Sequence, residues 1–182
     1  MARDDWLLGA SRQQAASERI YAAATDLIAR KGLEAFSIDT LAARVHCSPA
    51  TIYRHVGGKA NIRDEVLIRA GSRIVDTVRR EVENLSGPDR VVTAITTALA
   101  EIRSHPLGQL MFNSIRAQEM AWLKGSAIVA GFATELNGLS NDDEQAVHWI
   151  LRVVMSLMYW PADDAVTERQ IVERFVAPAF RP

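Results

Sequence analysis

Residues 37–59 of the chain read SIDTLAARVHCSPATIYRHVGGK, and this stretch carries the start signals of two short helices. Ser37 and Ser48 are of a residue type that favours the N-cap position. Pro49 follows the second serine at the first helical position, where its missing N–H costs nothing. Only residues 46–47 remain for the turn between the two helices. Two helices joined by so short a turn are typical of a DNA-reading helix-turn-helix.

The second of these helices has one apolar stripe and one polar face. Ile52 and Val56 stand four residues apart, so their side chains lie on the same side of the helix and form its buried stripe. The outer face combines small, hydroxyl, aromatic and basic side chains, namely Ala50, Thr51, Tyr53, Arg54 and His55. A face of this composition suits contact with phosphates and base edges.

The segment from about residue 17 to residue 67 resembles the N-terminal domain of the tetracycline-repressor (TetR) family. The resemblance is carried by TIYRHV at residues 51–56 and by Lys59. Upstream support comes from Ala23, Ala24, Leu27, Gly32, Ser37, Ile38, Leu41 and Ala42. The turn position that this family usually fills with glycine is His46, so we expect a left-handed backbone conformation there. The remainder of the chain is similar to the family only in being helical and of suitable length.

The resemblance implies a set of DNA contacts. Hydroxyl and ammonium groups on the exposed side of a helix can donate hydrogen bonds to phosphate oxygens. The residues at matching positions are Thr51, Tyr53, His55 and Lys59. Tyr53 and His55 could instead pack in the three-helix core. Arg54 is the expected base reader, because its guanidinium can pair with O6 and N7 of guanine, and a phosphate contact is its alternative. Thr40, Ser48, Pro49 and Ala50 complete the predicted DNA-binding set.

Composition narrows the classes of function. The chain has 182 residues, of which 48% are hydrophobic, and a formal net charge of −1. DNA affinity must therefore come from a focused patch rather than from an overall positive field. A single cysteine, Cys47, excludes an intrachain disulfide framework and a thiolate zinc cluster. No long apolar run or secretory leader is visible, so we expect a soluble, cytoplasmic protein without membrane contact.

Periodicity along the chain predicts an all-α protein. We expect an N-terminal three-helix helix-turn-helix domain joined by a long helix to a C-terminal helical ligand-binding and dimerisation domain. The first domain, with a mobile N-terminal arm over residues 1–12, spans residues 1–58, and the second spans 59–182. The arm is either terminal disorder or a DNA contact. The other expected helices cover residues 13–31, 59–85, 88–103, 106–115 and 117–137, followed by two helices whose capping-box-like starts are Asn141 and Thr167.

The stretch between Glu144 and Trp160 carries two apolar stripes. A surface helix needs only one stripe for its own core, so the second indicates a two-fold partner chain. In the resembled family, the last two helices of each subunit form a four-helix dimer interface. The predicted interface residues are Ala146, Trp149, Val153, Trp160, Ile171 and Phe175.

A ligand pocket is the least specific prediction. The second domain is rich in methionine and aromatic side chains, which suit a cavity for an apolar ligand but also suit ordinary core packing. The predicted lining is Leu99, Ile102, Arg103, Met111, Phe112, Met120, Trp122, Met155 and Met158.

The remaining reactive residues predict no chemistry. His105 and His148 have no carboxylate at ligand spacing, so we expect no metal, and we expect no cofactor. Cys47 is expected to replace a small apolar turn residue, with a redox switch as the alternative.

The predicted function is therefore that of a homodimeric, sequence-specific transcriptional regulator. We expect a repressor that binds a palindromic operator in double-stranded DNA and is released by a small apolar ligand. One alternative is a ligand-independent or nucleoid-associated protein of the same fold. Another is a helical dimerisation module without DNA function. An enzyme is not expected, because the sequence contains no nucleophile triad, metal-protease motif or phosphate-binding loop.

Overall fold

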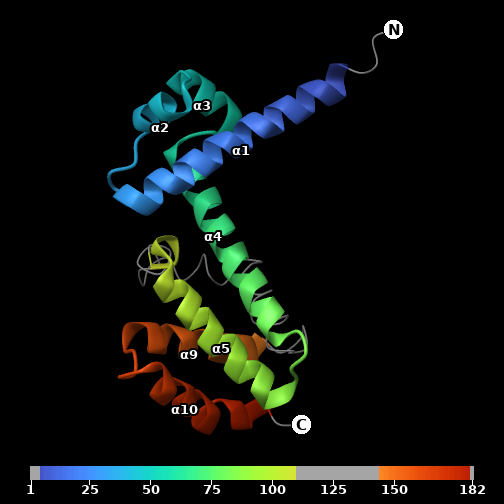
Figure 1. Cartoon of the computed structure of the whole chain (residues 1–182), viewed down its shortest axis with the longest axis vertical. Helices are drawn as coiled ribbons and strands as arrows, with labels where there is room; N and C mark the ends of the chain where they lie inside the picture. The colour runs from blue at the N-terminus through green and yellow to red at the C-terminus, as the bar shows by residue number, and fades with distance from the viewer. Residues whose placement is uncertain (1–4, 110–143, 181–182) are drawn as a thin grey trace. The chain divides into compact units, whose positions relative to one another are not determined.

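A computed structural model describes residues 5–109 and 144–180 of the chain, which divides into the compact units Met1–Arg69 and Ala70–Pro182. Every element in these described ranges is a helix, and they contain no strand, so the all-α prediction is confirmed (Figure 1). None of the described helices combines the length and the apolar character that crossing a membrane requires.

The N-terminal unit is built from α1 (Asp5–Lys31), α2 (Ile38–Val45), α3 (Pro49–Val56) and the first turns of α4 (Lys59–Val82). Helices α1, α2 and α3 contact one another pairwise. Their buried apolar side chains are Ile20, Ala24, Leu27 and Ile28 of α1, Ile38, Leu41 and Ala42 of α2, and Ile52 and Val56 of α3. The helix-turn-helix predicted over residues 37–59 is therefore present with both helices in the expected places.

The N-terminal arm predicted over residues 1–12 is wrong from Asp5 onward, because α1 already begins there. Residues 5–12 read DWLLGASR, which contains no proline and several good helix formers. A single glycine weakens a helix without stopping it, so the helix predicted from residue 13 extends toward the N-terminus. Its predicted end is confirmed, since α1 finishes at Lys31 and Gly32 follows with φ of 78°.

The turn between α2 and α3 adopts the backbone conformation expected from the sequence. His46 has φ of 56° and ψ of 48°, which lies in the left-handed region. Among the described residues it is the one non-glycine residue with a positive φ. The backbone N–H of Cys47 then donates to the carbonyl oxygen of Ala42 over 3.0 Å, which closes the end of α2.

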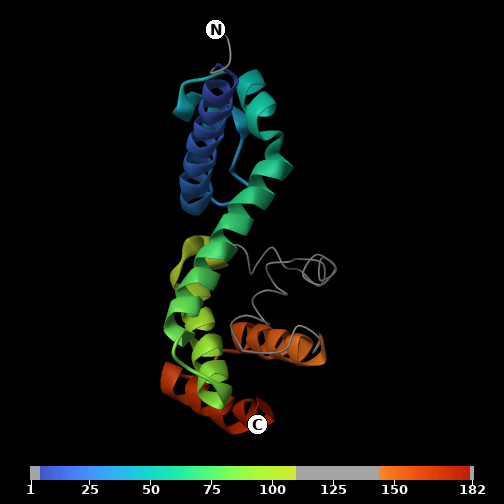
Figure 2. The same ribbon diagram turned by 90° about the vertical axis from the view of Figure 1, so that its right-hand side faces the viewer.

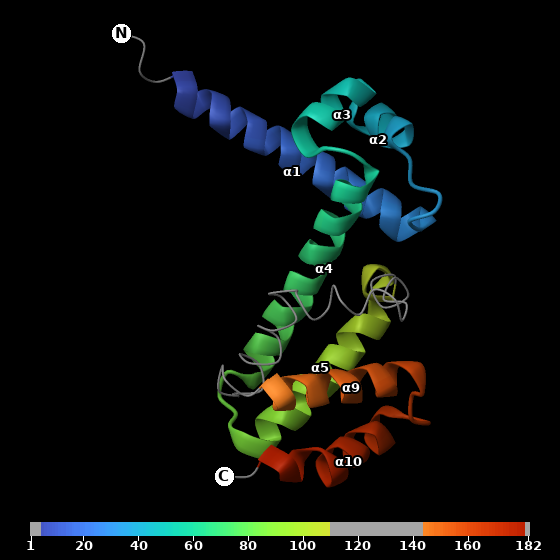
Figure 3. The same ribbon diagram turned by 180° about the vertical axis from the view of Figure 1, so that it is seen from behind.

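The C-terminal unit surrounds α5 (Gly87–Ser104) with the later turns of α4, with α9 (Glu144–Tyr159), with α10 (Ala165–Phe175) and with the short helix η1 (Ala177–Phe180). One side of α5 packs on α4 through Ala94, Ala98 and Ile102, which meet Ile74, Val78 and Val82 (Figure 2). Another side packs on α9, α10 and η1 through Val91, Val92, Ile95 and Leu99, which meet Ile150, Val154, Leu157, Val172, Val176 and Ala177 (Figure 3). Helix α5 is thus the centre of this unit.

The helices predicted over residues 59–85 and 88–103 are confirmed as α4 and α5, with α4 ending three residues earlier than predicted. The helix predicted from residue 106 is helical as far as residue 109. Its remainder, the helix predicted over 117–137 and the capping residue Asn141 lie outside the described residues.

The start predicted for the last helix is wrong, because Asp164 rather than Thr167 is the N-cap of α10. The Asp164 carboxylate accepts a hydrogen bond of 2.7 Å from the backbone N–H of Thr167. This bond holds the pKa of Asp164 below its usual value. Aspartate is as good an N-cap as threonine, and it stands first in the chain, so the helix begins at Ala165 and Thr167 lies inside its first turn.

A half-buried ion pair links three helices of the C-terminal unit. The Arg103 guanidinium on α5 donates to both carboxylate oxygens of Glu168 on α10, over 2.9 and 2.6 Å. It also donates to the carbonyl oxygen of Leu157 on α9 over 2.9 Å. Glu168 is only 4% exposed, so its charge depends on this arginine.

We expect Glu168→Ala to lower the free energy of unfolding by about 2–3 kcal/mol, because it leaves a half-buried guanidinium without its carboxylate. The matched control is Glu173→Ala, which removes an exposed pair with Arg169 and should cost less than about 1 kcal/mol. Urea denaturation at fixed protein concentration measures both values. Equal losses in the two variants would contradict a structural role for the Arg103–Glu168 pair.

Candidate nucleic-acid interface

Helix α3 buries its two-residue stripe and presents its other side chains outward. Ile52 and Val56 are buried, whereas Tyr53 is 57% exposed and Arg54 is exposed. Pro49 and Ala50 are also exposed at the start of the helix. The face predicted to read DNA is therefore accessible, and it carries the guanidinium and the phenol on one short helix.

The two helices of the motif begin with the same arrangement of hydroxyl groups. Ser48 Oγ accepts from the backbone N–H of Thr51 over 3.2 Å and lies 3.0 Å from the Thr51 hydroxyl. Ser37 Oγ accepts from the backbone N–H of Thr40 over 3.2 Å and lies 2.8 Å from its hydroxyl. Each helix start therefore pairs two hydroxyls at the positive end of a helix dipole, where an anionic phosphate is stabilised.

His55 and Tyr53 differ in exposure, although the sequence predicted both as phosphate contacts. His55 is half-buried, and its Nδ1 makes no hydrogen bond within the described part of the chain. Its backbone carbonyl accepts a 3.4 Å hydrogen bond from the Ser17 hydroxyl, which joins α3 to α1. Tyr53 is the more open of the two side chains, so it is the better placed for a phosphate.

The turn from α3 to α4 requires glycine at position 57. Gly57 has φ of 78°, and residues other than glycine adopt this backbone conformation only with strain. A Cβ atom there would also lie 2.5 Å from the Asn61 side-chain nitrogen. This tight turn brings Lys59, which is exposed, directly after α3. The nine predicted DNA-contact residues thus belong to α2, to α3 with its N-cap Ser48, and to the first residue of α4, Lys59.

The N-terminal unit is held together by charged contacts that the sequence did not indicate. Arg69 of α4 donates to both Glu18 carboxylate oxygens, over 2.7 and 2.8 Å, and to Glu65 over 2.7 Å. Its guanidinium also lies 4.6 Å from the centre of the Tyr21 ring. Hydrogen bonding from Arg69 lowers the pKa of Glu18, and the pair raises the pKa of Arg69. The pKa of Tyr21 is raised, mainly by burial.

A second charged contact ties α1 to α2. Asp26 accepts from Arg30 over 2.7 Å within α1 and also pairs with Arg44 of α2. Glu18 and Arg69 are 51 residues apart, so no local spacing rule could have paired them. These contacts fix the supports of α3 rather than touching its outer face.

The residues predicted to form a dimer interface divide into two groups. Trp149, Trp160, Ile171 and Phe175 are exposed in the single chain, with 48%, 77%, 36% and 66% of their surface accessible. Ala146 is half-buried, and Val153 packs partly against the core of its own unit. Tyr159 and Val166 are two further exposed apolar residues that the sequence analysis did not select.

In the described part of the chain, most of the predicted ligand-pocket residues serve core packing or an ion pair. Leu99 and Ile102 are buried in the core, and Arg103 is paired with Glu168. Met155 is half-buried, and Met158 packs against the core. Met111, Phe112, Met120 and Trp122 lie outside the described residues. Within the described ranges no cluster of three or more metal-ligating side chains occurs.

The chain is similar to known bacterial regulators over its whole length. The model of the family described as bacterial regulatory proteins, tetR family, matches residues 20–66. Two uncharacterised HTH-type transcriptional regulators of Mycobacterium tuberculosis, Rv1255c and MT1294, are each 30% identical to the chain. Each alignment runs over 190 residues and covers 100% of this chain and 93% of the relative.

Two solved structures share the fold. A regulatory protein of the tetR family from Rhodococcus RHA1 superposes with a TM-score of 0.55 at 20% identity. A protein from Saccharomonospora viridis, described as a transcriptional regulator in complex with choline, superposes with a TM-score of 0.50 at 18% identity. Each alignment covers 89% of this chain and 97% of the other. With the helix-turn-helix in place and relatives that align with the whole of this chain, the chain belongs to the TetR family of bacterial transcriptional regulators, which are not enzymes.

Proposed function

We propose that this TetR-family regulator is a homodimeric repressor that binds a palindromic operator and leaves it when a small molecule binds. The observation that carries the proposal is the outer face of α3, where Tyr53 and Arg54 are exposed while Ile52 and Val56 are buried. A recognition helix held by its inner stripe can enter the major groove without losing its own packing.

In this proposal the two kinds of contact have different tasks. The paired hydroxyls of Ser37 with Thr40 and of Ser48 with Thr51, together with Lys59, bind phosphates and set the register of the helix. Arg54 reads a guanine through O6 and N7, and Pro49 and Ala50 contact a neighbouring base edge. His55, half-buried beside α1, acts mainly by holding the helix in place.

The exposed apolar side chains of α9 and α10 support a homodimer. Trp149, Trp160 and Phe175 expose large aromatic surfaces on consecutive helices of one unit. Contiguous exposed apolar surface marks an association site, and a two-fold partner covers it with its own copy. Two reading heads related in this way require operator half-sites about one helical turn apart, roughly 34–36 Å.

Release by a ligand is supported by chain connectivity and by a structural relative. Helix α4 continues without a break from the N-terminal unit into the C-terminal unit, so a ligand bound in the latter can act on the former through this helix. The Saccharomonospora viridis protein was solved with choline. A regulator of this fold that ignores ligands is the second candidate, and operator binding that no ligand changes would favour it.

We expect Arg54→Ala and Tyr53→Ala to weaken operator binding without changing helix content. Arg54→Ala should also relax the preference at one base pair by about 1–3 kcal/mol, whereas Tyr53→Ala should weaken all sequences alike. The control is Arg80→Ala, which removes the same charge from an exposed position on α4.

The operator for this measurement comes from selecting bound DNA out of a random pool, and affinities are measured at several salt concentrations. A recovered palindrome with salt-dependent affinity supports the proposal. No salt-dependent binding to any DNA would instead favour a helical dimerisation module. Unchanged affinity in both α3 variants would contradict the assignment of α3 as the recognition helix.

We expect Trp149→Glu to convert the dimer into monomers, because it places a charge in an apolar interface. The control is Gln145→Glu, which adds the same charge at an exposed position near the start of α9. Sedimentation velocity across a range of protein concentrations distinguishes the two species. A Trp149→Glu protein that remains dimeric at the affinity of the unchanged chain would place the interface elsewhere.

A further inference from the structure

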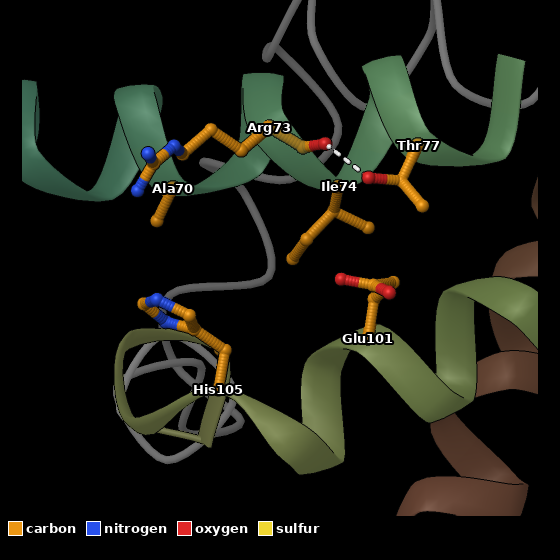
Figure 4. A pocket seen from close by; sticks show the side chains of 7 residues that line it. Ala70, Arg73, Ile74, Thr77, Glu101 and His105 are labelled. Carbon is orange, nitrogen blue, oxygen red and sulfur yellow. Dashed lines mark hydrogen bonds between the residues drawn. The ribbon is translucent and has the colours of Figure 1, made fainter. Parts of the chain in front are cut away.

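The C-terminal unit contains a cavity of about 310 Å³ between the middle of α4 and the end of α5 (Figure 4). It is lined by Ala70, Arg73, Ile74, Thr77, Glu101, His105 and Gly108. None of the residues predicted from the sequence to hold an apolar ligand belongs to this lining. Its volume lies at the lower end of the range for small-molecule sites, so it suits a small ligand.

The polar side chains of the cavity form two pairs of opposite character. Arg73 and Thr77 stand four residues apart on α4, Glu101 lies in the last turn of α5, and His105 is the C-cap residue that follows α5. Figure 4 shows the Arg73 and His105 side chains toward the end next to Ala70, while the Glu101 carboxylate lies by Ile74 and Thr77. Four residues of helix rise about 6 Å, which sets the approximate separation of the two pairs.

The pair formed by Arg73 and His105 offers hydrogen-bond donors. His105 Nδ1 accepts a 3.2 Å hydrogen bond from the backbone N–H of Leu107, so the proton of the neutral ring resides on Nε2. The Arg73 guanidinium makes no side-chain hydrogen bond or ion pair to any described residue. This end of the cavity therefore favours an anionic group with two oxygens, such as a carboxylate.

The pair formed by Glu101 and Thr77 offers acceptors. The Glu101 carboxylate is half-buried and has no ion-pair or hydrogen-bond partner among the described residues. The Thr77 hydroxyl donates its proton to the carbonyl oxygen of Arg73 over 3.2 Å and accepts from the Arg80 guanidinium over 3.2 Å, which leaves one lone pair to accept from a ligand. A half-buried carboxylate without a cationic partner favours an ammonium group beside it.

The two charges of the cavity do not satisfy each other, although both line it. The structure contains no Arg73–Glu101 ion pair, and the apolar side chain of Ile74 lies on the wall between the Arg73 guanidinium and the Glu101 carboxylate. An apolar ligand would take water from the half-buried Glu101 carboxylate without replacing it, which is costly, and it would leave the exposed Arg73 guanidinium unused. A ligand with a single charge would leave the opposite end unpaired.

We propose that this cavity binds a small zwitterion, with its ammonium group at Glu101 and Thr77 and its carboxylate at Arg73 and His105. The inference rests on the proposed function, in that this zwitterion is the effector that weakens operator binding. It replaces the apolar effector expected from the methionine and aromatic content of the sequence. Gly108 closes the site tightly, because a Cβ there would lie 2.5 Å from the carbonyl oxygen of Ile102.

Calorimetric titration of the full-length dimer with a homologous series tests the ligand class. The probes are glycine, β-alanine, γ-aminobutyrate and δ-aminovalerate, with butyrate and butylamine as controls that each lack one charge. We expect one amino acid of the series to bind at least tenfold more tightly than both single-charge controls. Binding of none of the four, or equal binding of the best amino acid and its single-charge controls, would overturn the proposal.

Two charge-neutral variants assign the ends of the ligand. Glu101→Gln should weaken the best zwitterion and butylamine about tenfold or more while leaving butyrate unchanged. Arg73→Gln should do the reverse, weakening the zwitterion and butyrate but not butylamine. Glu81→Gln, at an exposed position on α4 outside the cavity, is the matched control and should change nothing. Unaltered zwitterion binding in both cavity variants would also overturn the proposal.

A titration of the same probe with and without operator separates this inference from the proposed function. A zwitterion that binds the cavity and is weakened reciprocally by operator supports both. Equal zwitterion affinity with and without operator would support the cavity as a zwitterion site but would contradict operator release by a ligand bound there. If an apolar ligand releases the operator and no zwitterion binds, the zwitterion site is wrong, but the proposed function as a ligand-released repressor is supported.

Discussion

The face of α3 that we propose reads DNA depends on the burial of two side chains, Ile52 and Val56. A helix of eight residues is too short to be stable alone in water, so α3 exists only because this stripe packs against α1 and α2. The same burial decides which side chains point outward. Because the stripe occupies one side of the helix, Tyr53 and Arg54 are left on the other, and the recognition surface is a consequence of the core.

The backbone around α3 is as constrained as its packing. The left-handed conformation of His46 turns the chain sharply enough for α3 to begin with only three residues between it and the end of α2, and Gly57 provides a second sharp turn at the other end of α3. Ion pairs farther from α3 stabilise the helices that pack behind it. The Arg69–Glu18 pair joins those two helices, and the Asp26–Arg44 pair joins α1 to α2, so the unit behind α3 is held by charge as well as by apolar contact.

The C-terminal unit combines an apolar centre with charges whose roles differ by environment. Arg103 and Glu168 pair across α5 and α10, where burial makes each depend on the other. Arg73 and Glu101 line one cavity without pairing with each other, and we propose that they bind a ligand. The Arg103–Glu168 pair thus stabilises the packing of the unit, whereas Arg73 and Glu101 are the charges of the proposed ligand site.

The sequence by itself determined the elements that depend on local rules. N-cap serines, the proline of α3, the spacing of Ile52 with Val56 and the unusual residue at His46 are all read within one or two helical turns, and each is where it was expected. The same locality explains the errors. Helix α1 extends back to Asp5 because nothing in DWLLGASR stops it, and α10 starts at Asp164 because two good capping residues compete three positions apart.

Only the tertiary structure decided which distant side chains meet. The pairs Glu18–Arg69 and Arg103–Glu168 join residues 51 and 65 positions apart, and no periodicity in the chain relates them. The charged cavity arises because α4 and α5 pack side by side, which places Arg73 and Thr77 of α4 opposite the last turn and the C-cap of α5. Local physical chemistry shapes each helix from its own residues, but contacts between helices depend on packing that no single segment encodes.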